Sequence, residues 1–167
     1  HALEFVGKRS ALPPLGLLTV AALLPSEWPV RLVDANVREL SEADLAWADC
    51  VFISAMVVQR ESARRMISRC KAAGLRVVAG GPLFVGEHEQ FADADHFVLN
   101  EAELTLPPFL EDLARGTPKR LYATDRLADV RKTPPPRWDL LELKRYGSMS
   151  IQYSRGCPFD CDFCSVP

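Results

Sequence analysis

Short apolar runs alternate along most of the chain with segments whose apolar residues recur at helical spacing. The runs are four or five residues long and rich in Val, Ile, Leu and Phe, which predicts buried strands at residues 30–34, 50–54, 76–79 and 96–99. Helices are predicted at residues 15–24 and 41–47, in a segment that ends before Gly74, and in one that ends at 115–116. Strands alternating with helices predict an α/β fold with a doubly wound parallel sheet.

Two of these helices carry residues that need separate interpretation. In the helix before Gly74, Met66 and Cys70 lie on the apolar face, so we interpret Cys70, like Cys50 in its strand, as a core residue. In the last helix, Pro107 and Pro108 are expected in the first turn, where a missing backbone N–H costs least.

The periodic pattern ends near residue 117, where a proline-rich connector begins. Pro118 and the run at 134–136 indicate a semi-rigid linker. After it we expect a short amphipathic helix at 138–145 and a strand at 148–153. The predicted organisation is therefore an α/β domain at 1–118, a linker at 119–147 and the start of another unit at 148–167.

Composition narrows the functional classes. The 167 residues are 48% hydrophobic and 25% charged, with a net charge of -2, which is typical of a soluble domain and gives no basic footprint for nucleic acid. The longest apolar stretch, at 15–24, is too short to span a bilayer, and the first residues do not resemble a signal peptide. We expect a cytoplasmic protein without a transmembrane segment that acts on a small molecule. Because it begins with His1 and stops soon after its last cysteine, we also expect a fragment.

Ligands of doubly wound sheets bind where the strands end, which directs attention to three loops. These loops cover residues 54–58, 80–86 and 100–103. Glycines in the second loop would let a backbone approach a ligand closely, although a plain tight turn explains them almost as well. The candidate cofactor contacts are Ser54, Ala55, Met56, Gly80, Gly81, Pro82, Asn100 and Glu101.

Three cysteines near the end of the chain have the spacing C-x-x-x-C-x-x-C, at Cys157, Cys161 and Cys164. A closed zinc site or an ordinary iron-sulfur cluster uses four protein ligands, so three thiolates leave one coordination position open. The alternatives are a zinc site completed by a distant histidine, or a disulfide with one spare thiol. The chain has no second pair of ligands at zinc spacing, and we interpret its three histidines as surface or turn residues.

This cysteine motif, with Phe163 before its last cysteine, resembles the signature of the radical S-adenosylmethionine (radical SAM) enzymes. The resemblance implies that the three cysteines hold a 4Fe-4S cluster and that S-adenosylmethionine chelates its fourth iron. It further implies a radical that removes hydrogen from an unactivated carbon, and an external electron donor such as flavodoxin or ferredoxin.

An α/β domain, a proline-rich connector and a cysteine loop follow one another as in the cobalamin-binding (B12) radical SAM enzymes. The strings at 13–17, 80–82 and 100–103 resemble that family, with Asn100 in place of a usual glycine. The resemblance implies a Rossmann-like or flavodoxin-like cobalamin-binding domain whose first strand is missing here, followed by the first strand and cysteine loop of a truncated radical SAM barrel. Because the D-x-H-x-x-G motif is absent, we expect cobalamin to bind without a protein histidine ligand.

Within that family, the strings at 11–22 and 150–161 are most similar to the hopanoid methylase branch. The resemblance therefore implies the N-terminal fragment of a methyltransferase that acts on an unactivated carbon of a lipid-like or other small molecule, inactive as a fragment. Two alternatives stay open. One is an oxidative cyclase like the anaerobic Mg-protoporphyrin monomethyl ester cyclases, and the other is a small-molecule binding module with a structural zinc site.

Overall fold

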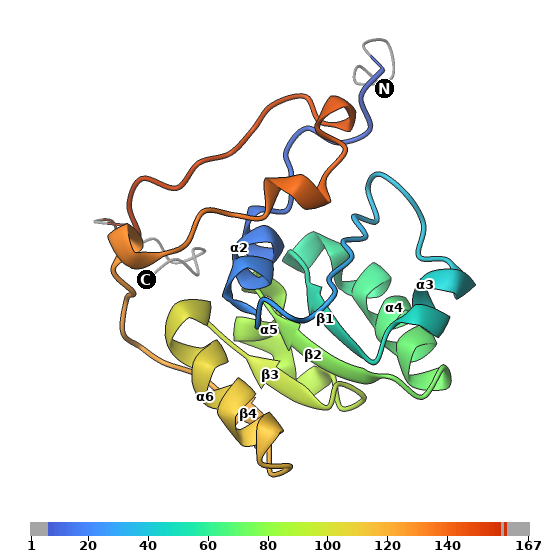
Figure 1. The fold of residues 1–167 in the computed structure, drawn as a ribbon, viewed down its shortest axis with the longest axis vertical. Helices are drawn as coiled ribbons and strands as arrows, with labels where there is room; N and C mark the ends of the chain where they lie inside the picture. The colour runs from blue at the N-terminus through green and yellow to red at the C-terminus, as the bar shows by residue number, and fades with distance from the viewer. Residues whose placement is uncertain (1–6, 158, 160–167) are drawn as a thin grey trace.

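The computed structural model describes residues 7–157 and 159, and a parallel sheet lies at its centre (Figure 1). Each strand pairs with the next one along the chain, in the order β1-β2-β3-β4. The strands are β1 (Cys50–Ser54), β2 (Arg76–Gly80), β3 (His96–Val98) and β4 (Leu121–Tyr122). Because all pairings are parallel, the carboxyl ends of the strands meet at one edge of the sheet, called here the carboxyl edge.

Helices cover both faces of this sheet. On one face, α2 (Leu15–Leu23) packs beside α6 (Ala102–Ala114), and the other face carries α4 (Arg60–Ala72) and α5 (Pro82–Glu87) (Figure 1). The short α3 (Glu42–Trp47) begins at the expected capping box, in which Ser41 and Asp44 exchange hydrogen bonds. Helices on both faces of a parallel sheet confirm the predicted α/β class.

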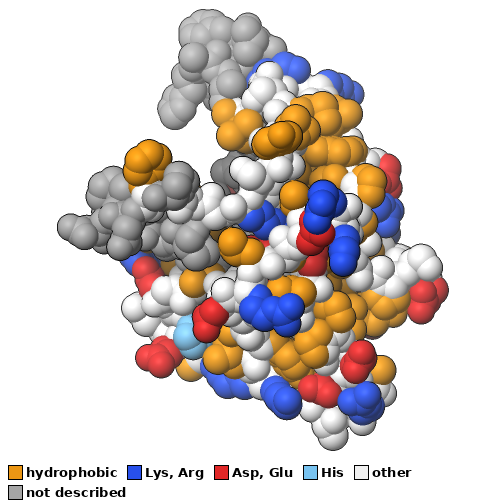
Figure 2. All heavy atoms as spheres, turned by 90° about the vertical axis from the view of Figure 1, so that its left-hand side faces the viewer, with side chains coloured by type: hydrophobic (Ala, Val, Ile, Leu, Met, Phe, Trp, Pro, Cys, Tyr) orange, Lys and Arg blue, Asp and Glu red, His pale blue; other side chains and the backbone are white. Residues whose placement is uncertain are grey.

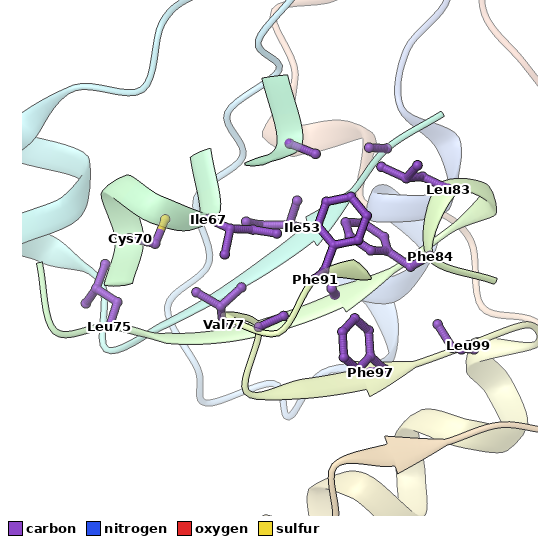
Figure 3. Packing of buried hydrophobic residues seen from close by; sticks show 14 of the residues in the cluster. Ile53, Ile67, Cys70, Leu75, Val77, Leu83, Phe84, Phe91, Phe97 and Leu99 are labelled. Atoms are coloured by element: carbon purple, nitrogen blue, oxygen red, sulfur yellow. The ribbon is translucent and has the colours of Figure 1, made fainter. Parts of the chain in front are cut away.

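Alternate residues of each strand point to opposite faces and build two cores. On the α4 and α5 side, the ring of Phe84 lies 4.9 Å from that of Phe91 and 6.2 Å from that of Phe97, measured between centroids (Figure 3). On the other side, Phe109 of α6 packs edge to face against Tyr122 of β4, with ring centroids 5.5 Å apart. The two cores account for the apolar runs of the strands, which are buried from both sides.

The strand predicted at 30–34 does not form, because its backbone has no neighbour with which to pair. Among the described residues, β1 pairs only with β2. Its other edge faces the segment 28–36 across a groove of about 800 Å³. Apolar side chains at 30–34 therefore line this groove instead of joining the sheet.

Both predictions for 138–153 were also wrong. Residues 138–145 form two separate 3-10 turns, η4 (Trp138–Leu140) and η5 (Leu143–Arg145), and residues 148–153 pair with no strand. Backbone hydrogen bonds instead hold this part of the chain against residues 9–11, with Gly147 N–H donating to the Ser10 carbonyl at 2.9 Å. The connector also supplies β4, which sequence patterns did not predict because it spans only two residues.

The prolines of α6 lie one turn later than predicted. The helix begins at Ala102, since the N–H groups of Leu104 and Thr105 donate to the Glu101 carbonyl at 2.9 and 3.0 Å. Pro107 and Pro108 therefore occupy the second turn, where each lacks the N–H that would bond to a carbonyl four residues earlier.

Candidate functional site

A cavity of about 120 Å³ opens at the carboxyl edge, between α2 and the ends of β1, β2 and β3. Most of its lining is apolar or backbone. Of the predicted cofactor contacts, the cavity brings together Ser54, Gly80, Gly81 and Asn100. The three predicted loops therefore do meet at one place, as expected for parallel strands that end side by side.

Gly80 and Gly81 are required by the packing of the protein itself. A Cβ on Gly80 would lie 2.6 Å from the Val98 carbonyl oxygen, and one on Gly81 would lie 2.3 Å from the Ser54 hydroxyl oxygen. Gly81 also has a φ of 87°, in the region that favours glycine. These glycines let the loop after β2 press against β3 and the end of β1, so tight packing accounts for them.

Asn100 occupies a left-handed turn between β3 and α6. Its φ is 63°, a conformation that glycine and then asparagine tolerate best. Its side-chain amide donates to the Thr124 carbonyl at 2.7 Å, which ties the turn to the start of the connector. Asparagine therefore preserves the turn geometry that the family's glycine would supply.

The remaining predicted contacts follow cavity-lining residues in the sequence but do not line the cavity. Ala55 is buried and accepts a hydrogen bond at its carbonyl from Leu83 N–H at 3.0 Å, while Pro82 is the first residue of α5. Met56 is exposed, as are the next two residues, Val57 and Val58. An exposed apolar run beside a cavity is the kind of surface that binds an apolar partner or ligand.

Gly16, in the first turn of α2, also lines the cavity and was not predicted as a site residue. Its φ is not positive, and a Cβ placed on it would meet no other atom within 4 Å. Glycine in a helix is unfavourable by up to about 1 kcal/mol relative to alanine. The fold does not require this glycine, but its missing side chain keeps the cavity mouth open.

A buried ion cluster stands beside the cavity and joins the cysteine segment to α6. Arg155 donates to the carboxylates of Glu101 and Glu103, reaching Glu103 through both terminal nitrogens. Thr133 donates to the same Glu103 at 2.7 Å, and Ala128 N–H donates to Glu101 at 3.2 Å. The side chains of Arg155, Glu101 and Glu103 are only 9%, 17% and 13% exposed. We call these three residues the Arg155 clamp.

Within the clamp, Arg155 and Glu103 favour each other's charged form despite burial. Burial would raise the pKa of Glu103, but hydrogen bonds from Arg155 and Thr133 outweigh it and hold that pKa below its usual value. The hydrogen bond to Glu103 is also the main cause that raises the pKa of Arg155. Both acidic residues stand at the start of α6, where the helix dipole favours negative charge.

Of the three predicted metal ligands, Cys157 is exposed, two residues after Arg155, while Cys161 and Cys164 lie outside the described residues. Cys70 is fully buried in the core, as predicted. Cys50 is partly buried against the α6 side, and burial raises the pKa of its thiol to about 11. Neither lines the carboxyl-edge cavity.

The histidine assignments were partly wrong. His96 belongs to β3 and is buried, with its Nδ1 2.7 Å from the Lys119 carbonyl oxygen, so it is neither a surface nor a turn residue. Its position in a strand covered by Phe109 explains the burial. His88 lies in the 3-10 turn after α5, partly buried against Phe97. His1 lies outside the described residues.

The charged surface is mixed. Figure 2 shows Lys, Arg, Asp and Glu side chains interspersed among hydrophobic ones on the face that it draws. This mixture matches a net charge of -2 and does not favour a polyanionic partner. Within the described part of the chain, no helix is long and apolar enough to cross a membrane.

Known proteins resemble this chain closely. The model of the B12 binding domain family matches residues 9–110. An uncharacterized methyltransferase of Synechocystis sp. is 50% identical over 98% of this chain and 31% of its own length. The hopanoid C-2 methylase of Rhodopseudomonas palustris is 36% identical over 93% of this chain and 30% of its own. The anaerobic magnesium-protoporphyrin IX monomethyl ester cyclase of Synechocystis sp. is 25% identical over 93% and 38%.

The chain thus spans about a third of the length of these relatives. The similarities confirm the resemblance to cobalamin-binding enzymes and to the hopanoid methylase branch, because both the family model and the methylase align with the α/β domain. With a match that covers more than half of its residues, and with a parallel sheet whose strand ends surround a cavity, the chain belongs to the B12 binding domain family.

Proposed function

We propose that this chain is the cobalamin-binding part of a radical SAM methyltransferase, and that its carboxyl-edge cavity is the cobalamin site. The observation that carries the proposal is the cavity between α2 and the strand ends, which Gly16 leaves open in a chain of the B12 binding domain family. The methyltransferase names of two of the relatives reported above favour methyl transfer.

The size of the cavity determines how cobalamin fits. A volume of about 120 Å³ accepts a slender group but not a corrin macrocycle, so the ring would stay outside the cavity. The exposed side chains of Met56, Val57 and Val58 offer an apolar surface for it there. When bound, cobalamin supplies the methyl group that is transferred.

The cavity residues would bind and orient this cofactor without supplying a charge to it. The Ser54 hydroxyl and the Asn100 backbone are polar groups within a lining that is otherwise mostly apolar. Leu17 and Val20 of α2 form the opposite wall and exclude water from the inserted group. Glu101 does not line the cavity, because its carboxylate is turned toward Arg155, and a direct cofactor contact by Glu101 stays a prediction.

The cysteine segment would hold the second cofactor. Thiolates of Cys157, Cys161 and Cys164 have the number and spacing for a 4Fe-4S cluster with one open position, at which S-adenosylmethionine would bind. Such chemistry needs an external electron donor, for example flavodoxin or ferredoxin, and a small-molecule substrate. The rest of the active site would lie in the other two thirds of a protein of the relatives' length.

A second candidate function is radical oxidative cyclisation. The similarity to the magnesium-protoporphyrin cyclase covers 93% of the chain, so the same domain arrangement serves at least one protein named as a cyclase. We favour methyl transfer over cyclisation, because the chain is 36% identical to the hopanoid methylase and 25% identical to the cyclase.

Anaerobic reconstitution of the full-length protein tests the proposal. We expect a 4Fe-4S absorption spectrum that Cys161→Ala abolishes and that Cys50→Ala, a change remote from the motif, leaves intact. Titration with hydroxocobalamin should give one bound equivalent, and label from methyl-labelled S-adenosylmethionine should appear in a carbon-methylated product. Tightly bound zinc in place of iron, or wild-type protein that binds no cobalamin, would refute it.

A further inference from the structure

The chain between the connector and the cysteine motif is fastened to the α/β domain at two places. The first is the backbone pairing at residues 145–148, next to which Tyr146 donates its hydroxyl proton to Asp34 at 3.0 Å. The second is the Arg155 clamp. Between them, the side chains of Ile151 and Tyr153 are almost fully exposed. Among the described residues, 149–154 make no hydrogen bond to the domain. The clamp at Arg155 therefore fixes the position of the end of this segment.

Arg155 suits this task better than a lysine would. Its planar fork contacts Glu103 through two nitrogens while one of them also reaches Glu101, an arrangement that a single ammonium cannot reproduce. Removing the guanidinium would leave two buried carboxylates with no charged donor, held by Thr133 and by the backbone N–H groups of Ala128 and Glu103. Loss of one member of a buried charge cluster costs far more than loss of a surface ion pair.

The clamp also links the cavity lining to the first residue of the cysteine motif. Glu101 stands between Asn100 and Ala102, both of which line the cavity. Cys157 follows Arg155 by two residues, so its Cα lies within about 7 Å of the Arg155 Cα, the reach of two extended residues. The side chains of Arg155 and Glu101 therefore connect the start of the cysteine motif to the segment that lines the cavity.

We propose that Arg155, bound by Glu101 and Glu103, is a positioning residue that fixes the start of the cysteine loop against the rim of the cofactor cavity. Transfer of a methyl group to a carbon radical needs both cofactors to face the same substrate carbon. The consequence for turnover rests on the proposed function, whereas the mechanical role of the clamp does not.

Limited proteolysis of the cofactor-free, full-length protein tests the mechanical role. Tyr153 is exposed, and chymotrypsin can cleave after it only when the segment moves away from the points that fasten it. Arg155→Met should therefore speed this cleavage by about tenfold or more, as expected for losing charge-assisted hydrogen bonds. Arg131→Met is the matched control, because Arg131 lies in the same connector and its side chain is 86% exposed in its ion pair with Asp129. Cleavage after Tyr122, which is buried in β4, should stay as slow as in the wild type in each variant, which verifies the fold.

Two further variants keep the test decisive if Arg155→Met misfolds. Arg155→Lys should give an intermediate rate of cleavage after Tyr153, and Glu103→Gln should also speed this cleavage. The double variant Arg155→Met with Glu103→Gln should be cleaved no faster than Arg155→Met alone, since the two residues act as one unit. A rate of cleavage after Tyr153 that is the same in the wild type and in all clamp variants would overturn the proposal.

Turnover separates positioning from cofactor binding. In reconstituted Arg155→Lys protein we expect wild-type iron and cobalamin content, but about tenfold less methylated product for each 5'-deoxyadenosine released. An unchanged ratio would refute the positioning role in catalysis. Wild-type protein that binds neither cofactor would instead refute the proposed function, and the proteolysis experiment would still decide the mechanical role.

Discussion

Replacing Gly16 should change stability and cobalamin affinity in opposite directions. The residue sits in the first turn of α2 and lines the carboxyl-edge cavity. A Cβ there meets no atom within 4 Å, so Gly16→Ala creates no clash in the cofactor-free protein, and Gly16→Leu adds a longer side chain at the same exposed position. Both residues are better helix formers than glycine. The cofactor-free variants should therefore be slightly more stable than the wild type.

The expected magnitudes follow from helix propensity and from packing. An interior helical glycine costs up to about 1 kcal/mol relative to alanine, and a position in the first turn should show about half of that. In the presence of cobalamin, the added methyl group would overpack a cavity of about 120 Å³. Overpacking costs about 1–3 kcal/mol, which corresponds to roughly a 5- to 150-fold increase in Kd. Leucine, with four side-chain carbons, should abolish detectable binding.

The assay pairs urea unfolding of the cofactor-free, full-length protein with an absorbance titration by hydroxocobalamin. Gly86→Ala is the matched control, because Gly86 is an exposed glycine of α5 whose Cβ would also meet nothing within 4 Å, and it does not line the cavity. That variant should gain similar stability and keep wild-type affinity. The reasoning fails if Gly16→Leu binds hydroxocobalamin as tightly as Gly86→Ala does.

Three further predictions concern other parts of the site. Asn100→Gly should keep the wild-type free energy of unfolding, whereas Asn100→Val should lower it by more than about 1 kcal/mol, because a β-branched residue tolerates a φ of 63° poorly. Equal unfolding midpoints of the two variants in urea would contradict this prediction. In cofactor-free protein at about pH 8, iodoacetamide should modify the exposed Cys157 much faster than Cys70 or Cys50. Cys70 is buried, and burial raises the pKa of the Cys50 thiol to about 11. Peptide mapping measures the three rates, and equal rates would contradict this prediction. The pKa of Glu103 is lower in the folded state than its ordinary value of 4.5. Its contribution to stability is therefore present above that pH and is lost as the pH falls through the folded value. Glu103→Gln should flatten the fall of Tm below about pH 4.5, and parallel curves of Tm against pH for the two proteins would refute this prediction.

The sheet was predictable because its strands are buried on both faces. Continuous apolar runs at 50–54, 76–79 and 96–99 became β1, β2 and β3 within one or two residues. The run at 30–34 is also rich in Val and Leu, yet pairing requires a neighbouring backbone, and a pattern of apolar residues does not report whether one is present. The opposite failure occurred at β4, whose two residues are too few to show any period.

The meeting of the three loops at one cavity was predictable for a related reason. Parallel strands share a carboxyl edge, so any residue that follows a strand must lie there, and Ser54, Gly80 and Asn100 all do. Gly16 was not found, because a helical glycine is usually interpreted as a weakness in the helix. A useful signal was available: Gly16 is preceded by two prolines that already define the start of α2, so it serves neither as a cap nor as a turn residue.

The Arg155 clamp was beyond sequence reasoning for a different physical reason. Periodicity reports which residues of one element share a face, but Arg155 and Glu103 are 52 residues apart, and β4 and the connector lie between them. Only the path of the connector, which returns along residues 9–11, brings the arginine back to the start of α6. Charge pairs of this kind can be inferred from sequence only when the intervening fold is already known. The acidic pair at 101 and 103 could be assigned to a ligand from the pattern alone, whereas the structure shows that a neighbouring arginine neutralises much of its charge. The two carboxylates at the start of α6 therefore tie the segment before Cys157 to the helix that follows the cavity lining.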